Sequence, residues 1–141
     1  MANKIRELRQ YGWNDQRVSV SLGINSRLDE FHAAILDFKL QFLDINNQKR
    51  RDIAQQYKEA FKNTPISVVE NVQNSLHVYH LFVIRCKNRD GLRKYLTDNG
   101  VVTGIHYQSP THLMPSFSDQ SRLAETEIFC NEIISLPMYP D

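Results

Sequence analysis

One segment limits what this chain can fold into: between residues 27 and 61, apolar side chains recur at helical spacing on two opposed faces. Steps of three and four residues separate the members of the first stripe, which are Leu28, Phe31, Ile35, Phe38, Phe42 and Ile45. The second stripe points roughly 150° away and consists of Ala33, Leu36, Leu40 and Leu43. We therefore expect one face to pack on its own domain, and the other on a second domain or a second subunit.

The length of this helix leads to the same expectation. Unbroken from Arg27 to Phe61, it would be about 50 Å long, whereas a compact domain of this size has a radius of gyration of only about 14 Å. The weak helix formers Asp44, Asn46 and Asn47 predict a kink or break within it. An overhanging helix fits a piece of a larger protein better than a free-standing domain.

The rest of the chain predicts a small α+β domain with helices on one face of a short sheet. We expect three parts: residues 1–24 with a short helix over 3–10 that ends at Gly12, a linker helix over 25–62, and an α+β domain over 63–141. In that domain, strands are expected at Ile66–Val69, Val78–Cys86 and Val101–Tyr107, and helices from Asp90, as the N-cap, to Gly100 and over Ser121–Ile134.

Composition excludes several classes of protein. The 17 basic and 16 acidic residues leave a net charge of +1, which argues against a nucleic-acid or anionic-membrane binder held by bulk electrostatics. No apolar run is long enough to span a bilayer, no signal peptide opens the chain, and Cys86 and Cys130 form no CxxC pair, so we expect a cytoplasmic location. GxGxxG, GxxxxGK[ST], GxSxG and HExxH are all absent. The chain therefore carries no self-contained catalytic signature.

The residues before the long helix form the first candidate site. Asn25 offers amide donors and Arg27 a guanidinium fork, and both come where free backbone N–H groups and the positive end of a helix dipole are expected. Such a set suits a phosphate group. An ordinary N-cap explains the same stretch, with Ser26 as the cap and Asp29 three residues later. From the residues alone, both interpretations stay open.

The histidines form the second candidate site. His77 and His80 are three residues apart, so on a strand they point to opposite faces and do not share a metal ion; we expect no metal. His106 and Tyr107 end an expected strand and lead into a loop with His112, a position that often lines a pocket. Satisfied polar residues at a surface account for the same spacing equally well.

A series of short motifs follows in order along nearly the whole chain. They are Leu8–Trp13, Gly23–Glu30, Ala33–Leu36, Arg50–Tyr57, Tyr79–Arg85, Gly104–Tyr107, Pro110–His112 and Leu136–Pro140. Each motif is weak alone, but as an ordered set they are specific. In these motifs the chain resembles the PLP-dependent sugar aminotransferases of the DegT/StrS type.

The resemblance implies the fold, the cofactor and the partners. The fold would be the small domain of the aspartate-aminotransferase type with its linker helix, and the reaction would be amino transfer, commonly from glutamate, to a nucleotide-linked keto-sugar. Members are homodimers in which the asparagine matching Asn25 contacts the phosphate of the partner's PLP, with Arg27 as a weaker match. His80, His106, Tyr107 and His112 would lie near the nucleotide-sugar.

The resemblance also implies what the chain lacks. The family's Schiff-base lysine lies upstream of the stretch matching Ile5–Gly12, and a last helix follows the stretch that ends at Pro140. We therefore expect no catalytic residue in this chain, and no amino transfer by the chain alone. The alternative is a non-catalytic module, derived from such an enzyme, for dimerisation or nucleotide-sugar binding.

Overall fold

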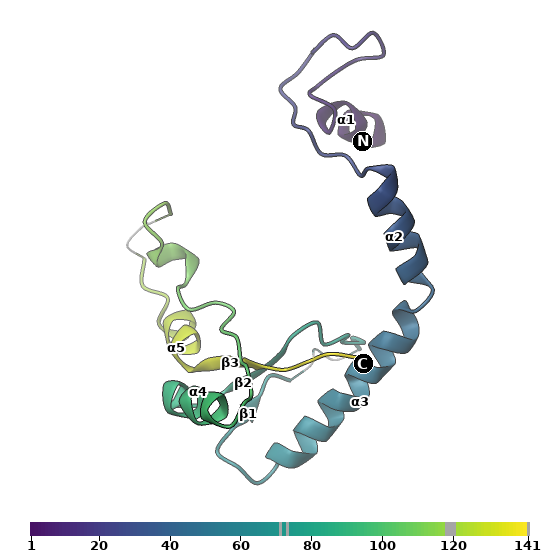
Figure 1. Ribbon diagram of the computed structural model, residues 1–141. Coiled ribbons are helices and arrows are strands. Elements are labelled where there is room, and N and C mark those ends of the chain that lie inside the picture. The colour runs from purple at the N-terminus through teal and green to yellow at the C-terminus, as the bar shows by residue number, and fades with distance from the viewer. Residues whose placement is uncertain (71, 73, 118–120, 141) are drawn as a thin grey trace. The chain divides into compact units, whose positions relative to one another are not determined.

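The computed structural model describes residues 1–70, 72, 74–117 and 121–140, and the chain divides into two compact units, Met1–Leu43 and Asp44–Asp141. The boundary between the units falls inside the segment expected as one linker helix. The three-part division expected from the sequence stays a prediction. Figure 1 labels the helices and strands along the chain.

The first unit opens with helix α1 (Ala2–Leu8), close to the short helix expected over residues 3–10. The chain then turns at Tyr11 and Gly12, whose φ angles are 60° and 71°. A side chain at Gly12 would collide with the carbonyl oxygen of Ser21, and one at Gly23 would collide with the backbone of Tyr11 and Gly12. The backbone segments approach so closely at these two positions that only glycine fits. The loop can therefore fold back onto the end of α1.

Helix α2 (Glu30–Leu40) has Asp29 as its N-cap, so the alternative interpretation with Ser26 as the cap is wrong. The expected helix is broken, but at residues 41–42 rather than at 44–47, because α2 ends at Leu40 and α3 (Leu43–Phe61) runs through residues 44–47. Asp44 lies in the first turn of α3, where an acidic side chain interacts favourably with the helix dipole. Its weak intrinsic helix propensity therefore matters little at that position.

The apolar side chains of α2 are exposed. None of the residues of α2 is buried, and the exposed fractions of Phe31, Phe38 and Leu40 are 74%, 62% and 63%. In the part of the chain that the structure describes, no helix has the length and hydropathy needed to cross a membrane. The apolar surface expected from the stripes is thus present and uncovered in the single chain.

The second unit contains an antiparallel sheet in the order β1 (Ser67–Val68), β2 (Phe82–Arg85) and β3 (Ile133–Leu136). Ile84 of β2 lies opposite Val68 on β1 and Ile134 on β3. Phe82 lies opposite Leu136, so these apolar side chains share one face of the sheet. Strands β1 and β2 are shorter than the segments expected from the sequence.

The core of this unit forms where α3 and α4 (Arg89–Asp98) meet the sheet. Ala54 of α3 is buried against the strand residues, and the ring of Tyr57 lies 4.9 Å from that of Phe82. Leu92 and Leu96 of α4 pack on the same cluster. The expectation of a small sheet with helices packed on it is confirmed.

Three local expectations in this unit are wrong. Residues 101–107 form no strand and make only an isolated bridge, from Gly104 to Ser135. Helix α5 (Ala124–Glu132) ends two residues early, because Ile133 and Ile134 are buried in β3. The N-cap of α4 is Asn88, not Asp90: its side chain accepts a hydrogen bond from the Gly91 backbone at 3.2 Å.

Candidate functional site

The first candidate site stands on a short extended segment of the first unit, residues 24–26. The Ile24 backbone N–H donates to the Leu8 carbonyl at 2.8 Å, and the Ser26 N–H donates to the Arg9 carbonyl at 2.9 Å. The Arg9 side chain also donates to the Ser26 carbonyl at 2.9 Å. Because its two neighbours make these bonds, the backbone N–H of Asn25 points away from residues 8–11. Asn25 is thus held on a firm backbone with its polar groups outward.

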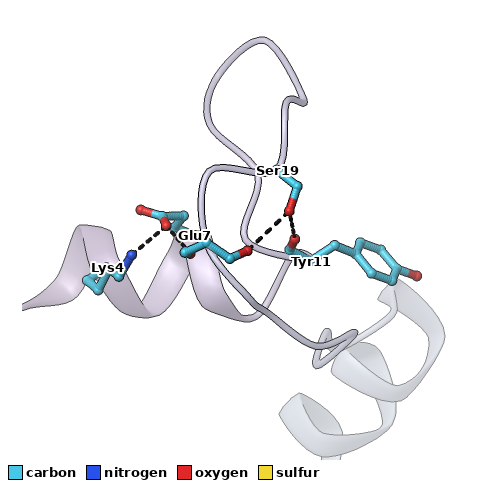
Figure 2. Close-up of polar contacts among 5 residues, drawn as sticks. Lys4, Glu7, Tyr11 and Ser19 are labelled. Atoms are coloured by element: carbon cyan, nitrogen blue, oxygen red, sulfur yellow. Dashed lines mark hydrogen bonds and ion pairs between the residues drawn. The ribbon is translucent and has the colours of Figure 1, made fainter.

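The loop that carries this segment is tied to α1 by side chains (Figure 2). Glu7 on α1 accepts from Lys4 at 2.6 Å and also from the hydroxyl of Ser21. The Ser19 hydroxyl donates to the Tyr11 carbonyl at 3.0 Å. The hydrogen bonds from Lys4 and from Ser21 lower the pKa of Glu7, and the Lys4 bond is the largest cause. The loop therefore has a defined shape although it contains little regular structure.

Asn25 and Arg27 interact directly. The Arg27 Nε donates to the Asn25 Oδ1 at 3.1 Å, which leaves the Asn25 amide N–H groups and the terminal guanidinium nitrogens available. Both residues are exposed. They line an open hollow of about 490 Å³ together with Leu28, Asp29 and Glu30. The structure thus brings together the two residues that the sequence predicted as phosphate ligands.

The amino end of α2 differs from the expected anion site. Asp29 accepts a hydrogen bond from the His32 backbone N–H at 2.9 Å, and its other oxygen contacts the His32 ring. The pKa of Asp29 is lowered, mainly by that backbone hydrogen bond and then by the ring contact. The helix therefore supplies its own carboxylate as a cap. Asn25 lies five residues before Glu30, so a phosphate here would be held by side chains rather than by the helix end.

The second candidate site lies in the second unit, around residues 104–112. The His106 Nδ1 lies 2.9 Å from the hydroxyl oxygen of Ser135 on β3. Gly104 and Ser135 also exchange two backbone hydrogen bonds, at 2.8 and 3.0 Å. The His106 and Tyr107 rings have their centroids 5.6 Å apart, and Tyr107 is 71% exposed. This arrangement presents an imidazole and a phenol at the surface from a segment anchored to the sheet.

His112 has a different environment from its neighbours. It lies in the short helix η1 (Thr111–Leu113), is only 8% exposed, and its Nε2 is 3.3 Å from a carboxylate oxygen of Glu127 on α5. That carboxylate also accepts from the Leu123 backbone at 3.1 Å. The contact fastens η1 to α5. A direct contact of His112 with a substrate stays a prediction.

The two remaining histidines lie before β2. His80 is exposed, while the His77 Nδ1 accepts a hydrogen bond from the Tyr79 backbone at 2.8 Å. Neither lies on a strand, so the alternation argument used for them does not apply. Among the residues described, no group of three or more His, Cys, Asp or Glu is placed to hold a metal ion.

Sequence reasoning missed two residues of the second site, Ser135 and Glu127. Ser135 is only 4% exposed and lies within the apolar run Ile133–Leu136. A buried polar residue in such a run needs a hydrogen-bond partner, and that need was a usable signal. Nothing in the local pattern around Glu127 indicates that it contacts His112.

Comparison with known proteins gives consistent matches. The sequence model of the DegT/DnrJ/EryC1/StrS aminotransferase family matches residues 1–141. The chain is 39% identical over 142 residues to a dTDP-3-amino-3,6-dideoxy-alpha-D-galactopyranose transaminase of Aneurinibacillus thermoaerophilus, covering 99% of this chain and 39% of that protein. It is 41% identical over 145 residues to the erythromycin biosynthesis sensory transduction protein EryC1 of Saccharopolyspora erythraea, covering 99% of this chain and 40% of that protein. The chain thus spans about two fifths of the length of these relatives.

Solved structures give the same result. The chain superposes on DesV of Streptomyces venezuelae with a TM-score of 0.92 at 35% identity, covering 99% of this chain and 39% of DesV. An aminotransferase of the same family from Brucella abortus gives 0.91 at 33% identity, covering 99% and 38%. The fold expected from the sequence, the small domain and linker helix of a PLP-dependent aminotransferase, is therefore confirmed. This chain belongs to the DegT/DnrJ/EryC1/StrS aminotransferase family.

Proposed function

We propose that this chain forms the carboxy-terminal part of an aminotransferase that moves an amino group from glutamate to a nucleotide-linked keto-sugar. The observation that carries the proposal is the family match over residues 1–141. Relatives at 39% and 34% identity are named as transaminases of dTDP-linked amino sugars, and they match over 99% of this chain. The chain by itself is proposed to be inactive, because it holds no lysine in the family's Schiff-base context.

Aminotransferases of this family depend on PLP, and the Asn25–Arg27 pair fits the phosphate of that cofactor. The pair presents amide and guanidinium donors at one exposed hollow. Two carboxylates, Asp29 and Glu30, line the hollow as well, and Asp29 is hydrogen-bonded to His32, which reduces its repulsion of an anion. When bound, PLP supplies the electron sink that amino transfer requires. The role of Asn25 and Arg27 is to bind and orient the phosphate.

We also propose that the bound phosphate belongs to a second subunit, in a homodimer formed through residues 28–45. The support is the uncovered apolar surface of α2, in which Phe31 is 74% and Phe38 62% exposed. Contiguous apolar patches of this kind mark interaction sites. In this proposal a symmetric dimer buries the apolar stripes of both subunits, and Asn25 of each subunit contacts the phosphate held by the other subunit.

The nucleotide-sugar is proposed to meet the second site. His80, His106 and Tyr107 are exposed, and they supply imidazole and phenol groups that bind hydroxyl and phosphate oxygens. His112 is buried, and its contact with Glu127 fastens the short helix η1 to α5; we propose that it lies near the nucleotide-sugar as well. We place the protein in the cytoplasm, in keeping with its two free cysteines, Cys86 and Cys130.

Substitution of Asn25 tests the cofactor proposal. In the full protein that carries this chain, Asn25→Asp should weaken PLP binding about tenfold to a hundredfold, because a carboxylate would face the phosphate. The dissociation constant is measured by titrating PLP into the apoprotein. Asn131→Asp, an equal change of charge at an exposed position on α5, is the matched control and should leave PLP binding unchanged.

Mixed dimers test the assignment to a second subunit. A subunit with Asn25→Asp is combined with one that lacks the Schiff-base lysine, at a PLP concentration too low to load the Asn25→Asp protein, so that each is inactive alone. If Asn25 acts across the interface, one of the two sites in the mixed dimer is intact, and amino transfer to a nucleotide-linked keto-sugar returns. Tight PLP binding by the Asn25→Asp protein, or mixed dimers without activity, would refute the assignment. Cofactor-independent binding of the nucleotide-sugar without any amino transfer would favour the non-catalytic module.

A further inference from the structure

We propose that Ser135 is a positioning residue that holds His106 as the neutral tautomer protonated at Nε2, so that an N–H donor points outward for an oxygen of the nucleotide-sugar. The proposal deepens the function proposed above and rests on it for the identity of the ligand. Its structural part, the orientation and tautomer of the His106 ring, rests on contacts within this chain. It concerns one hydrogen bond between residues 29 positions apart.

The burial of Ser135 decides the direction of that hydrogen bond. Ser135 is 4% exposed, and its hydroxyl lies 2.9 Å from the His106 Nδ1, its one side-chain partner among the residues described. If Nδ1 carried the proton, the buried serine O–H would have no acceptor, which is costly. If the serine donates to Nδ1, its O–H is satisfied and the ring proton lies on Nε2. The second arrangement is therefore favoured.

Gly104 fixes the position of the same ring. A Cβ atom built on Gly104 would lie 2.7 Å from the His106 Cε1, closer than such atoms approach. The φ angle of Gly104 is not positive, so its missing side chain makes room for the imidazole rather than for an unusual backbone conformation. The paired backbone hydrogen bonds between Gly104 and Ser135, at 2.8 and 3.0 Å, hold both partners in register. The Ser135 hydroxyl thus fixes the ring at Nδ1, and the missing side chain of Gly104 leaves space for Cε1.

The opposite edge of the ring is left for a ligand. In the described part of the chain, the His106 Nε2 has no hydrogen-bond partner, and His106 is exposed. A fixed N–H donor matches an acceptor oxygen, such as a sugar hydroxyl or a diphosphate oxygen, and does not match a cation. Orienting the donor in advance lowers the entropy that binding would otherwise cost.

The direct test measures the tautomer by ¹⁵N NMR of the full protein labelled at histidine, without any substrate. We expect His106 to show a protonated Nε2 and an unprotonated Nδ1. In Ser135→Ala the ring should exchange between tautomers and show averaged shifts for both nitrogens. A wild-type protein protonated at Nδ1, or a Ser135→Ala protein with the wild-type shifts, would overturn the proposal.

Two further variants separate positioning from general stability. Gly104→Ala keeps the serine hydroxyl but displaces the ring, so it should also perturb the His106 shifts. Thr103→Val is the matched control: it removes a neighbouring buried hydroxyl that has no partner among the residues described, and should leave the His106 shifts unchanged. Because the wild-type measurement needs no variant, a poorly folded Ser135→Ala protein would leave the primary result intact.

Binding measurements then test the ligand. Ser135→Ala should raise the dissociation constant of a nucleotide-sugar roughly two- to tenfold, with little change in the affinity for PLP. His106→Gln, whose amide can return a donor near the Nε2 position, should bind more tightly than His106→Asn. If the tautomer is as proposed but no nucleotide-sugar binds, the proposed function fails while the structural assignment stands. If binding is normal in Ser135→Ala, the positioning role fails.

Discussion

The two units of this chain differ in what holds their shape. The second unit has a closed core, in which Phe82 and Ile84 are 1% exposed and Ile134 is 0% exposed. The first unit, all of whose residues are described, contributes no apolar side chain to the buried core. Backbone hydrogen bonds, close glycine contacts and an Asp29 cap define its form instead. A buried apolar core therefore holds the second unit, whereas the first unit is held by hydrogen bonds and leaves large apolar side chains exposed.

Removing core volume should give the largest difference between the units. Ile134→Ala in β3 should lower the free energy of unfolding by about 2–5 kcal/mol, because it leaves a cavity in a closed core. Ile35→Ala in α2, where the side chain is 41% exposed, should cost less than about 0.5 kcal/mol in the isolated chain at concentrations where it is monomeric. Urea denaturation followed by circular dichroism measures both. Equal losses would mean that α2 is buried in the isolated chain.

Self-association of the chain should depend on side chains of the first unit and not on those of the second, the reverse of the effect on unfolding. Phe38→Ser should raise the dissociation constant of the dimer about tenfold to a hundredfold, because burying a phenylalanine contributes about 1.5–3 kcal/mol. Tyr95→Ser on α4 is the control: its side chain is as exposed, at 64% against 62% for Phe38, but lies in the second unit. Sedimentation equilibrium measures both constants. If Tyr95→Ser weakens association as much as Phe38→Ser, the interface does not follow the stripes.

Loss of a helix cap should have a smaller effect, in the second unit. Asn88→Ala removes the acceptor for the Gly91 backbone N–H and should lower the free energy of unfolding by about 0.5–2 kcal/mol. Asn131→Ala, at an exposed position inside α5, should change it by less than about 0.5 kcal/mol. The same urea titration measures them. A negligible effect of Asn88→Ala would show that core packing alone holds the start of α4.

The pH dependence of α2 should be the smallest effect. The folded-state pKa of Asp29 is lowered from 3.8, chiefly by the His32 backbone hydrogen bond. The carboxylate therefore stabilises α2 fully above that ordinary value, and the stabilisation is lost as the pH falls through the lowered pKa. The His32 amide shift, followed by NMR during acid titration, measures the change. Asp29→Asn should retain the cap and abolish this titration, and a persistent titration in that variant would implicate another group.

Structural features that depend on the spacing of nearby residues were predicted well from the sequence. The apolar repeat of residues 28–61 yields helices, and Gly12 turns the chain after α1 because its φ of 71° is accessible to glycine. The alternation around Phe82 and Ile84 indicates a strand. Asn25 and Arg27, the two residues predicted to bind a phosphate, are two positions apart in the sequence, so their proximity follows from the chain itself. The helix α5 was extended too far because Ile133 and Ile134 suit a helix face and a buried strand equally well.

By itself, the sequence determined the apolar surfaces and the turns, because these depend on residue spacing and on the conformational freedom of single residues. The family followed from the resemblance of its ordered motifs to known aminotransferases. Only the tertiary structure decided that Asp29 caps α2 and that residues 104–107 pair with β3 through a single bridge. It also decided that Ser135 reaches His106, and Glu127 reaches His112. The physical reason is that competing caps differ by a few tenths of a kcal/mol to about one, and distant contacts form only once the whole sheet and its helices have packed together.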